Sequence, residues 1–390
     1  MKISGGIIYP PKATKQTEGT RNVSHEKKTI SDQLDDAMEI IRKRNAELSE
    51  ANARIRAMHR ENDTAENIRT RIFNLAARDP DPPTWLKEIR GPNRTQEVPA
   101  VIWSDWHYGE KIVSAEVGGV NEFNAEIAQR RVKKLVNDTI DVAYHHTSDR
   151  KQKFPGAIVC LGGDMITGDI HDELRATNDR TPQEAINDLT DHIGGALEMM
   201  ASHFGRLFVP AVVGNHARDS MKPRMKGRVF TSHEWVIYCN LKRHFRKTKS
   251  IQFLIPSEAD AYFEVFSHRF LLTHGDSLGV KGGDGIIGAI GPIMRGTLKV
   301  RNSEKQVGRD IDTVVMGHWH QYIALRRVIV NNSLIGYNEF AKLGLRAEYS
   351  TPSQAFWLCH PKYGITAQRE IFVDDKKQSL IEKPWISWQE

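Results

Sequence analysis

The 390-residue sequence is poor in cysteine and has no long apolar run. Its three cysteines, Cys160, Cys239 and Cys359, lie in or near short apolar segments, which indicates buried thiols in a reducing compartment and argues against a disulfide framework. No apolar segment approaches the roughly 20 residues of a membrane span, and the N-terminus lacks the apolar core of a signal peptide. We therefore expect a cytoplasmic protein with no membrane partner.

The sequence also lacks internal repeats and the glycine-lysine spacing of a phosphate-cradling P-loop. Its 39% hydrophobic and 27% charged residues are typical of a globular protein. A formal net charge of +6 favours a polyanionic partner, but only weakly.

Two N-terminal segments differ sharply in pattern. Residues 1–29 are polar and aperiodic, so we expect a flexible tail. Residues 30–78 contain no glycine or proline and carry an apolar residue every seven positions, which predicts a long helix and a coiled coil. The repeating residues are Leu34, Ile41, Leu48 and Ile55, and the second core position of the heptad reads Met38, Asn45, Asn52 and His59. Asparagine at this second position favours a homodimer, whereas the alternative is a single helix docked on the catalytic domain.

The rest of the chain predicts one layered domain. A proline-rich linker is expected over residues 79–96, a catalytic domain over 97–375 and a C-terminal tail over 376–390. Within the domain, helices are expected at 124–146, at 181–204 behind a Thr-Pro-Gln-Glu capping box, and at 232–246. Strands that alternate with these helices, followed by a strand-rich end at 311–375, indicate an α/β domain with mixed sheets.

Five short polar motifs lie at the ends of apolar runs that we expect to be strands. The runs are residues 98–103, 157–161, 207–213, 269–273 and 313–316. The motifs are Asp105-Trp-His107, Gly163-Asp164, Gly214-Asn215-His216, His274-Gly275 and Gly317-His318-Trp-His320. Ligands of an open α/β sheet bind at the carboxyl ends of its strands, so these motifs are predicted to meet in one crevice. Because residues two apart on a strand share a face, Asp105 and His107 could serve one ion.

The candidate ligands are seven in number, too many for one tetrahedral ion. They are Asp105, His107, Asp164, Asn215, His274, His318 and His320. Such a set suits two divalent ions bridged by a shared carboxylate. Mixed imidazole and oxygen ligands favour Mn²⁺, with Fe, Zn or Ni as alternatives, over an all-oxygen Ca²⁺ or Mg²⁺ site. The alternative reading is five unrelated turns, but turns have no need of histidine.

As an ordered set, these motifs resemble the calcineurin-like metallophosphoesterase family over roughly residues 97–325. The resemblance implies a four-layer α/β/β/α sandwich with two mixed sheets, and phosphoester hydrolysis by a metal-bound hydroxide. It implies that Asp164 bridges two ions, one with Asp105, His107 and His320, the other with Asn215, His274 and His318. It also implies that His216 is catalytic, either stabilising the transition state or protonating the leaving oxygen.

Two features depart from the family pattern or lie outside it. Many members carry an acidic residue directly after Gly-Asn-His, whereas this chain has Ala217 and Arg218. Arg218 is either a phosphate ligand or an ordinary surface arginine. A second polar cluster contains Asp169, His171, Asp172 and Glu173. We interpret it as a polar loop in preference to a set of groups that support the ligands.

The substrate is indicated by two further features. The Asp-x-His-x-Gly form of the first motif resembles the DNA-repair nuclease branch of the family. Basic residues also follow His216 closely, at Arg218, Lys222, Arg224, Lys226 and Arg228, and a second basic run spans residues 295–309. Either run could neutralise a nucleic-acid backbone, the alternative being a solvated surface. We therefore favour a nuclease acting on DNA or RNA, with any ATPase or replication and repair partner on a separate chain. The alternatives are a phosphomonoesterase and a non-catalytic scaffold, which would not need every ligand.

Overall fold

The computed structural model describes residues 38–54, 83–87, 97–145, 154–279 and 289–374. The chain divides into two units, Met1–Ile72 and Phe73–Glu390. The described part of the first unit is one helix at residues 38–54, on which Met38, Ile41 and Leu48 are exposed. The helix prediction is therefore confirmed over this range. The rest of the predicted coiled coil, the tail at 1–29 and the C-terminal tail at 376–390 lie outside the described residues, and self-association stays a prediction.

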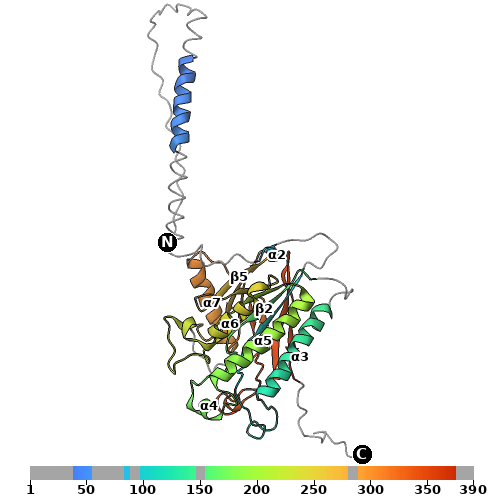
Figure 1. Ribbon diagram of the computed structural model, residues 1–390. Coiled ribbons are helices and arrows are strands. Elements are labelled where there is room, and N and C mark those ends of the chain that lie inside the picture. Colours follow the sequence, from blue (N-terminus) through green and yellow to red (C-terminus); the bar gives the residue numbers. More distant parts are fainter. Residues whose placement is uncertain (1–37, 55–82, 88–96, 146–153, 280–288, 375–390) are drawn as a thin grey trace, which may run out of the picture. The chain divides into compact units, whose positions relative to one another are not determined.

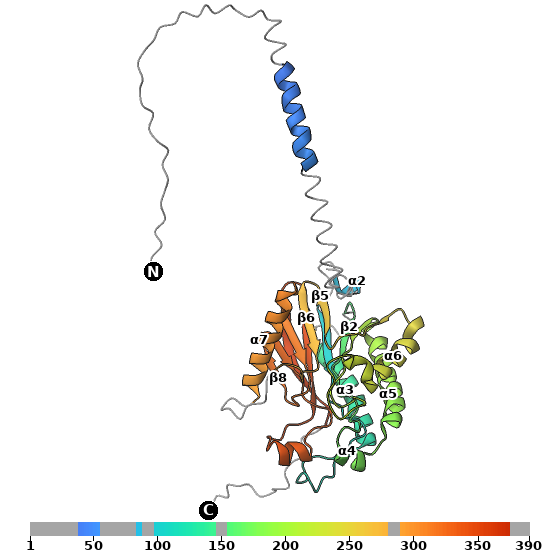
Figure 2. The ribbon, with the colours of Figure 1, turned by 90° about the vertical axis from the view of Figure 1, so that its left-hand side faces the viewer.

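The second unit is a four-layer α/β/β/α sandwich around two mixed sheets, as expected (Figures 1 and 2). The first sheet has the order β11 (Gly364–Phe372), β10 (Ser353–His360), β1 (Val98–Trp103), β2 (Ala157–Leu161), β3 (Leu207–Pro210) and β4 (Ile251–Leu254). Strands β1 to β4 are parallel, and β10 and β11 are antiparallel additions. The second sheet has the order β5 (Ala261–Val265), β6 (His268–Thr273), β7 (Thr313–Met316), β9 (Val328–Val330) and β8 (Ile323–Leu325).

Helices cover both outer faces, as Figure 2 shows edge-on. The first sheet is covered by α3 (Ala125–His145), α5 (Pro182–Phe204) and α6 (His233–His244), and the second by α7 (Ile290–Gln306). Shorter elements are α2 (Thr84–Lys87), α4 (Asp172–Thr177), 3₁₀ turns at Arg228–Thr231 and Phe245–Lys247, and a π-helical turn at Phe340–Gly344.

Alternating side chains of β1 build two of the three core layers. Val101 and Trp103 pack toward the helices, whereas Ala100 and Ile102 pack between the two sheets. A strand buried on both faces reads as a continuous apolar run, which is why residues 98–103 were recognisable in the sequence. A third core layer joins α7 to the second sheet through Ile293.

The predicted elements are largely confirmed, with one correction to their arrangement. All five expected strands form, although β3 ends at Pro210 instead of residue 213. They do not share one sheet edge, because β1, β2 and β3 belong to the first sheet and β6 and β7 to the second. The three expected helices are α3, α5 and α6, and the capping box forms, with Thr181 and Glu184 bonded reciprocally.

Part of the predicted linker belongs to the domain. Within residues 79–96, the short helix α2 buries Trp85 and Leu86 in the core between the sheets. The Leu86 carbonyl accepts a hydrogen bond of 2.8 Å from the Phe266 N–H. Burial of these two large apolar side chains stabilises the domain, whereas a solvated linker would leave them exposed to water. Among the described helices, none has the length and apolar character needed to cross a membrane.

Candidate metal centre

Five of the candidate ligands have left-handed backbone conformations just beyond strand ends. Their φ angles are 55° at Asp105, 48° at His107, 50° at Asp164, 70° at His318 and 51° at His320. Among the described non-glycine residues, only Phe266 and Arg346 share this positive φ. The conformation costs a non-glycine residue roughly 1–2 kcal/mol, and such strain clusters at functional sites.

Asp105 and His107 were predicted to share one face of a strand, and this prediction is wrong because both residues lie in left-handed turns. Strand β1 ends at Trp103, so neither residue lies on the pleated strand. Their side chains are aimed by the loop conformation and not by strand alternation. Backbone bonds hold this loop, because Asp105 N donates to the Gly163 carbonyl and His107 N to the Asp164 carbonyl, each at 3.0 Å.

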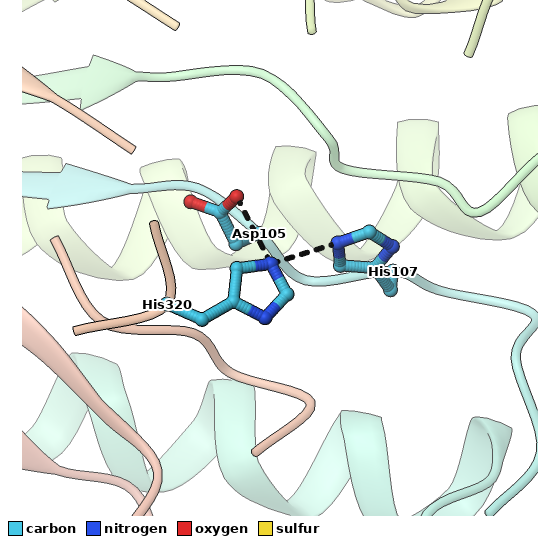
Figure 3. Close-up of side chains that lie close together, drawn as sticks. All are labelled: Asp105, His107 and His320. Carbon is cyan, nitrogen blue, oxygen red and sulfur yellow. Dashed lines mark hydrogen bonds and ion pairs between the residues drawn. The ribbon is translucent and has the colours of Figure 1, made fainter. Parts of the chain in front are cut away.

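Asp105, His107 and His320 form a first group of converging donor atoms (Figure 3). The Nε2 atoms of the two histidines lie 3.2 Å apart, and His320 Nε2 lies 3.4 Å from Asp105 Oδ1. Asp105 and His107 come from the loop after β1, whereas His320 comes from the loop after β7. Segments more than 200 residues apart in the chain therefore bring these nitrogen and oxygen atoms together.

Asp164, His274 and His318 form a second group. His274 Nε2 lies 3.0 Å from Asp164 Oδ2 and 3.1 Å from Asn215 Oδ1. The Nδ1–H of His274 is directed at the Gly162 carbonyl, 2.9 Å away, so the lone pair of a neutral ring is on Nε2. Three electron-rich atoms then face one another. A cation between them, either a proton or a metal ion, is required to make this arrangement favourable.

The pKa values of the histidines show where the protein itself favours a proton at this site and where it favours a neutral ring. Burial opposes protonation of His274, but the Asp164 carboxylate outweighs it and raises the pKa of His274 to about 10. Burial, followed by the charge of His274, lowers the pKa of His318 to about 4. Burial likewise holds the pKa of His107 well below its usual value. A metal is coordinated by neutral imidazoles, the form that burial favours at His107 and His318. Burial also opposes protonation of His320, but Asp105 outweighs it and raises the pKa of His320, so His274 and His320 would each give up a proton when a metal ion binds.

Asp164 links the two groups. Its carboxylate belongs to the second group and also to a set with His107 and His216, whose donor atoms all lie within 4.8 Å of one another. All seven predicted ligands thus converge, Asn215 through its contact with His274. These aspartate and histidine groups could hold metal, and their mixed oxygen and nitrogen donors suit a transition metal.

The glycines that precede the ligands provide room for the carboxylates. A β-carbon at Gly214 would collide with the Asp164 carboxylate, and one at Gly317 would collide with that of Asp105. Two of the motif glycines therefore reflect close packing against an acidic ligand from another loop.

Glu234 is a supporting residue that the sequence did not reveal. It lies fully buried in the first turn of α6, where its carboxylate accepts the backbone N–H of Met165 at 2.5 Å and of Gly214 at 2.7 Å. It therefore ties together the two loops that carry Asp164 and Asn215. Burial, then the nearby Asp164 charge, raises the pKa of Glu234 to about 8. An acidic residue early in a helix is too common to have marked it out.

Glu110 supports the first group in a similar way. The Thr167 hydroxyl donates to Glu110 at 2.9 Å and lies 3.2 Å from His107 Nδ1. Asn338 also donates to Glu110, at 3.0 Å. Such outer contacts fix the orientation of a ligating histidine. The signal available in the sequence was position alone, since Glu110 directly follows the Asp-x-His-x-Gly motif.

His216 lies beside the ligands without an acidic anchor. Its ring is edge-on to that of His107, with 4.6 Å between centroids, and its Nδ1 is buried with no hydrogen-bond partner. The missing acid at Ala217 is therefore not replaced at Nδ1. Burial lowers the pKa of His216. Of the polar cluster at residues 169–173, His171 contacts the His216 ring edge-on, with 5.9 Å between centroids.

Two of the five basic residues in the loop at 218–228 make contacts within the protein. Arg218 donates to the carbonyls of Asn215, Ser220 and Met221, and so braces its own loop. Arg228 forms a two-pronged ion pair with Asp276, at 2.7 and 2.8 Å. The remaining basic residues of the loop, Lys222, Arg224 and Lys226, are exposed. Substrate binding by the five basic residues of this loop stays a prediction. Lys222, Arg224 and Lys226 are the three that are exposed and could contact a substrate.

A cavity of about 630 Å³ adjoins the ligands. It is lined at one side by His107, Asp164, His216, His318 and His320. The remaining wall comes largely from residues 319–350. The site can therefore present bound metal to an organic molecule of moderate size.

Comparison with family models and with curated proteins finds no match to this chain. What the site can do is therefore inferred from its own donor atoms.

Proposed function

We propose that this protein is a metal-dependent phosphodiesterase, a nuclease that hydrolyses DNA or RNA with two divalent cations, Mn²⁺ in the first place. The observation that carries the proposal is the position of Asp164, whose carboxylate joins two groups of oxygen and nitrogen donors. The four-layer fold and the order of the motifs agree with the resemblance to calcineurin-like metallophosphoesterases.

In this proposal, Asp105, His107, Asp164 and His320 hold one cation, and Asp164, Asn215, His274 and His318 hold the other. Bound as a pair, such cations act as Lewis acids that neutralise charge developing on a phosphoryl group. Glu234 and Glu110 keep the ligand loops in register, because each accepts hydrogen bonds from groups beside a ligand.

His216 is the proposed proton carrier. Hydrolysis of a phosphodiester forms a P–O bond to a water oxygen and breaks the P–O bond to the departing oxygen, which takes up a proton. The His216 imidazole lines the cavity next to Asp164, and no side chain engages its Nδ1. Its ring is therefore placed either to donate a proton to that oxygen or, in the neutral form that burial favours, to stabilise the transition state by a hydrogen bond.

A polyanionic substrate is supported by the exposed Lys222, Arg224 and Lys226, which follow His216 closely in the chain. Neutralising phosphates with such residues releases condensed counterions and gives salt-dependent affinity.

The proposal is tested with chelator-treated protein reloaded with Mn²⁺. Bis-p-nitrophenyl phosphate, p-nitrophenyl phosphate, and labelled single- and double-stranded DNA are compared as substrates. Hydrolysis of the diester and of DNA is expected, with the monoester slower. Hydrolysis of the monoester alone would instead identify a phosphomonoesterase, and inactivity toward all four would indicate a scaffold.

We also propose that the chain self-associates through residues 30–78. Support comes from the helix at 38–54, where the heptad residues Ile41 and Leu48 are exposed. Light scattering should show a dimer for the full chain and a monomer after deletion of residues 1–80. A monomeric full chain would refute this.

A further inference from the structure

The cavity beside the candidate metal centre has an unusual lining. Aromatic and apolar side chains form much of its wall, at Trp319, Tyr337, Phe340 and Leu345. Besides the candidate ligand Asp164, four carboxylates line it, those of Glu110, Glu173, Glu339 and Glu348. Among the described residues that line the cavity, none is lysine or arginine.

This lining limits which part of a substrate can enter. A phosphate at the ligand groups would meet the charge of bound cations. A second phosphate deeper in the cavity would meet these carboxylates and, among the described lining residues, no lysine or arginine, which is unfavourable. The cavity therefore suits a neutral or cationic group attached to the phosphate that reacts.

Size and surface favour a flat organic group. A volume of about 630 Å³ lies in the range of pockets that enclose a drug-sized molecule, and it exceeds the needs of a small ammonium head group. Aromatic side chains provide faces on which the bases of single strands stack. Carboxylates accept hydrogen bonds from base amino groups, as they do from cytosine.

The rim carries apolar side chains that the protein leaves exposed. Phe340, Leu343 and Leu345 are 65%, 62% and 63% exposed, and they lie on or beside the π-helical turn Phe340–Gly344. Phe340 and Leu345 line the cavity as well, so both side chains border the space in which a ligand would sit.

We propose that this cavity receives one unpaired nucleobase next to the scissile phosphate. The inference rests on the proposed phosphodiesterase function and narrows its substrate to single-stranded ends or unpaired nucleotides. A base within continuous duplex is paired and stacked, and it would have to leave the helix to enter.

The test compares two esters that break the same bond and release the same chromophore. They are deoxycytidine 5′-(p-nitrophenyl phosphate) and methyl p-nitrophenyl phosphate, assayed with Mn²⁺-loaded protein. The ratio of their kcat/KM values reports the contribution of the nucleoside. Base stacking is worth about 1–3 kcal/mol per base, so Phe340→Ala should lower this ratio by about 5- to 150-fold. The methyl ester should be hydrolysed at an unchanged rate.

Tyr363→Ala is the matched control. Tyr363 is an equally exposed aromatic residue, 68% accessible, in the turn between β10 and β11. Because Cys359 pairs with Val98 at the start of β1, this turn lies at the end of the sheet away from the ligands. The control should leave the ratio unchanged. Leu345→Ala, a second exposed rim variant, should lower the ratio in the same direction as Phe340→Ala.

The outcomes separate the two proposals. If Mn²⁺-loaded wild type hydrolyses neither ester, the phosphodiesterase function itself fails. If it hydrolyses the methyl ester but shows no nucleoside advantage, or if Phe340→Ala slows both esters equally, the nucleobase inference is overturned and the function stands. A preference for p-nitrophenyl phosphorylcholine over the nucleoside ester would also overturn it, because the cavity would then take a cationic group.

Discussion

The carboxylate of Asp164 packs so closely against the α-carbon of Gly214 that a β-carbon there would collide with it. The same glycine donates its N–H to the buried Glu234 at 2.7 Å, and Glu234 in turn accepts from Met165, the residue after Asp164. The position of the proposed bridging ligand is therefore set by the pairing of two loops.

Gly214→Ala should disturb this pairing. The added methyl group must displace either the Asp164 carboxylate or the loop, so metal affinity should fall by about 10- to 100-fold, the range seen when groups around a ligand are lost. Isothermal titration with Mn²⁺ measures this. Gly195→Ala is the control, because Gly195 lies in α5 with open space around its α-carbon. It should leave Mn²⁺ affinity unchanged and stabilise the protein by about 0.5–1 kcal/mol. Equal Mn²⁺ affinities for Gly214→Ala and Gly195→Ala would show that the close packing of Gly214 against Asp164 does not determine metal binding.

His216→Ala should separate chemistry from metal binding. We expect metal content near that of wild type and turnover lowered by about 10²- to 10⁴-fold, as for a lost general acid. Metal analysis and diester kinetics on the same preparation provide the measurement. If metal disappears together with activity, His216 is a ligand, a reading that its proximity to His107 and Asp164 also permits.

Charge removal in the basic loop should affect DNA alone. Replacing Lys222, Arg224 and Lys226 with glutamine should weaken DNA binding and flatten its dependence on salt, by a slope of up to about 0.9 per lost phosphate contact on duplex DNA. Hydrolysis of a small diester should persist. Arg228 is left in place because it pairs with Asp276. The control replaces Lys242, Arg246 and Lys247, exposed near the other end of α6. An equal loss of DNA affinity in both triple variants would mean that the loop contributes only through the net charge of the protein.

Asp260 should make stability depend on pH. Burial raises the pKa of Asp260 from its ordinary value of 3.8 to about 6, its Oδ1 has no hydrogen-bond partner, and Glu304 and Glu258 add to the effect. The folded state therefore holds the proton more tightly than the unfolded state. The cost of charging Asp260 is absent below about pH 4, grows as the pH rises through 4 to 6, and is complete above that range.

Asp260→Asn removes this cost, so the variant should be more stable than wild type at pH 8 by on the order of 2–3 kcal/mol, with no difference near pH 4. Urea unfolding of metal-free protein across this range measures the effect. Asp141→Asn, the same substitution at an exposed position on α3, is the matched control. A pH-independent difference for Asp260→Asn would contradict the assignment.

The sequence was most informative where burial and chemistry coincide. Runs such as residues 98–103 and 313–316 are buried on both faces, so their apolar continuity identified β1 and β7, and the polar residues after them are those that converge. The division of these strands between two sheets was not visible in the runs themselves. It depends on packing across the core between sheets, for example that of Ile102 and Phe270.

Other features depend on contacts that have no local signal. Glu234 acts through two backbone amides that are far from it in sequence, and nothing in residues 232–246 distinguishes it from a surface glutamate. The helix α7 was seen only as a run of basic residues, because its apolar side, with Ile293, is short and contains glycines. Trp85 was assigned to a linker because the neighbouring prolines dominated that pattern.

We infer that Asp164 would be the ligand shared by two metal ions that support phosphodiester hydrolysis. Titration of Mn²⁺ into metal-free wild type and metal-free Asp164→Asn, alongside hydrolysis of bis-p-nitrophenyl phosphate, tests this role of Asp164. We expect two Mn²⁺ per wild-type chain and activity that appears as they bind. In Asp164→Asn we expect loss of both metal and activity, while circular dichroism shows the fold retained. Two tightly bound Mn²⁺ and normal turnover in Asp164→Asn would contradict it.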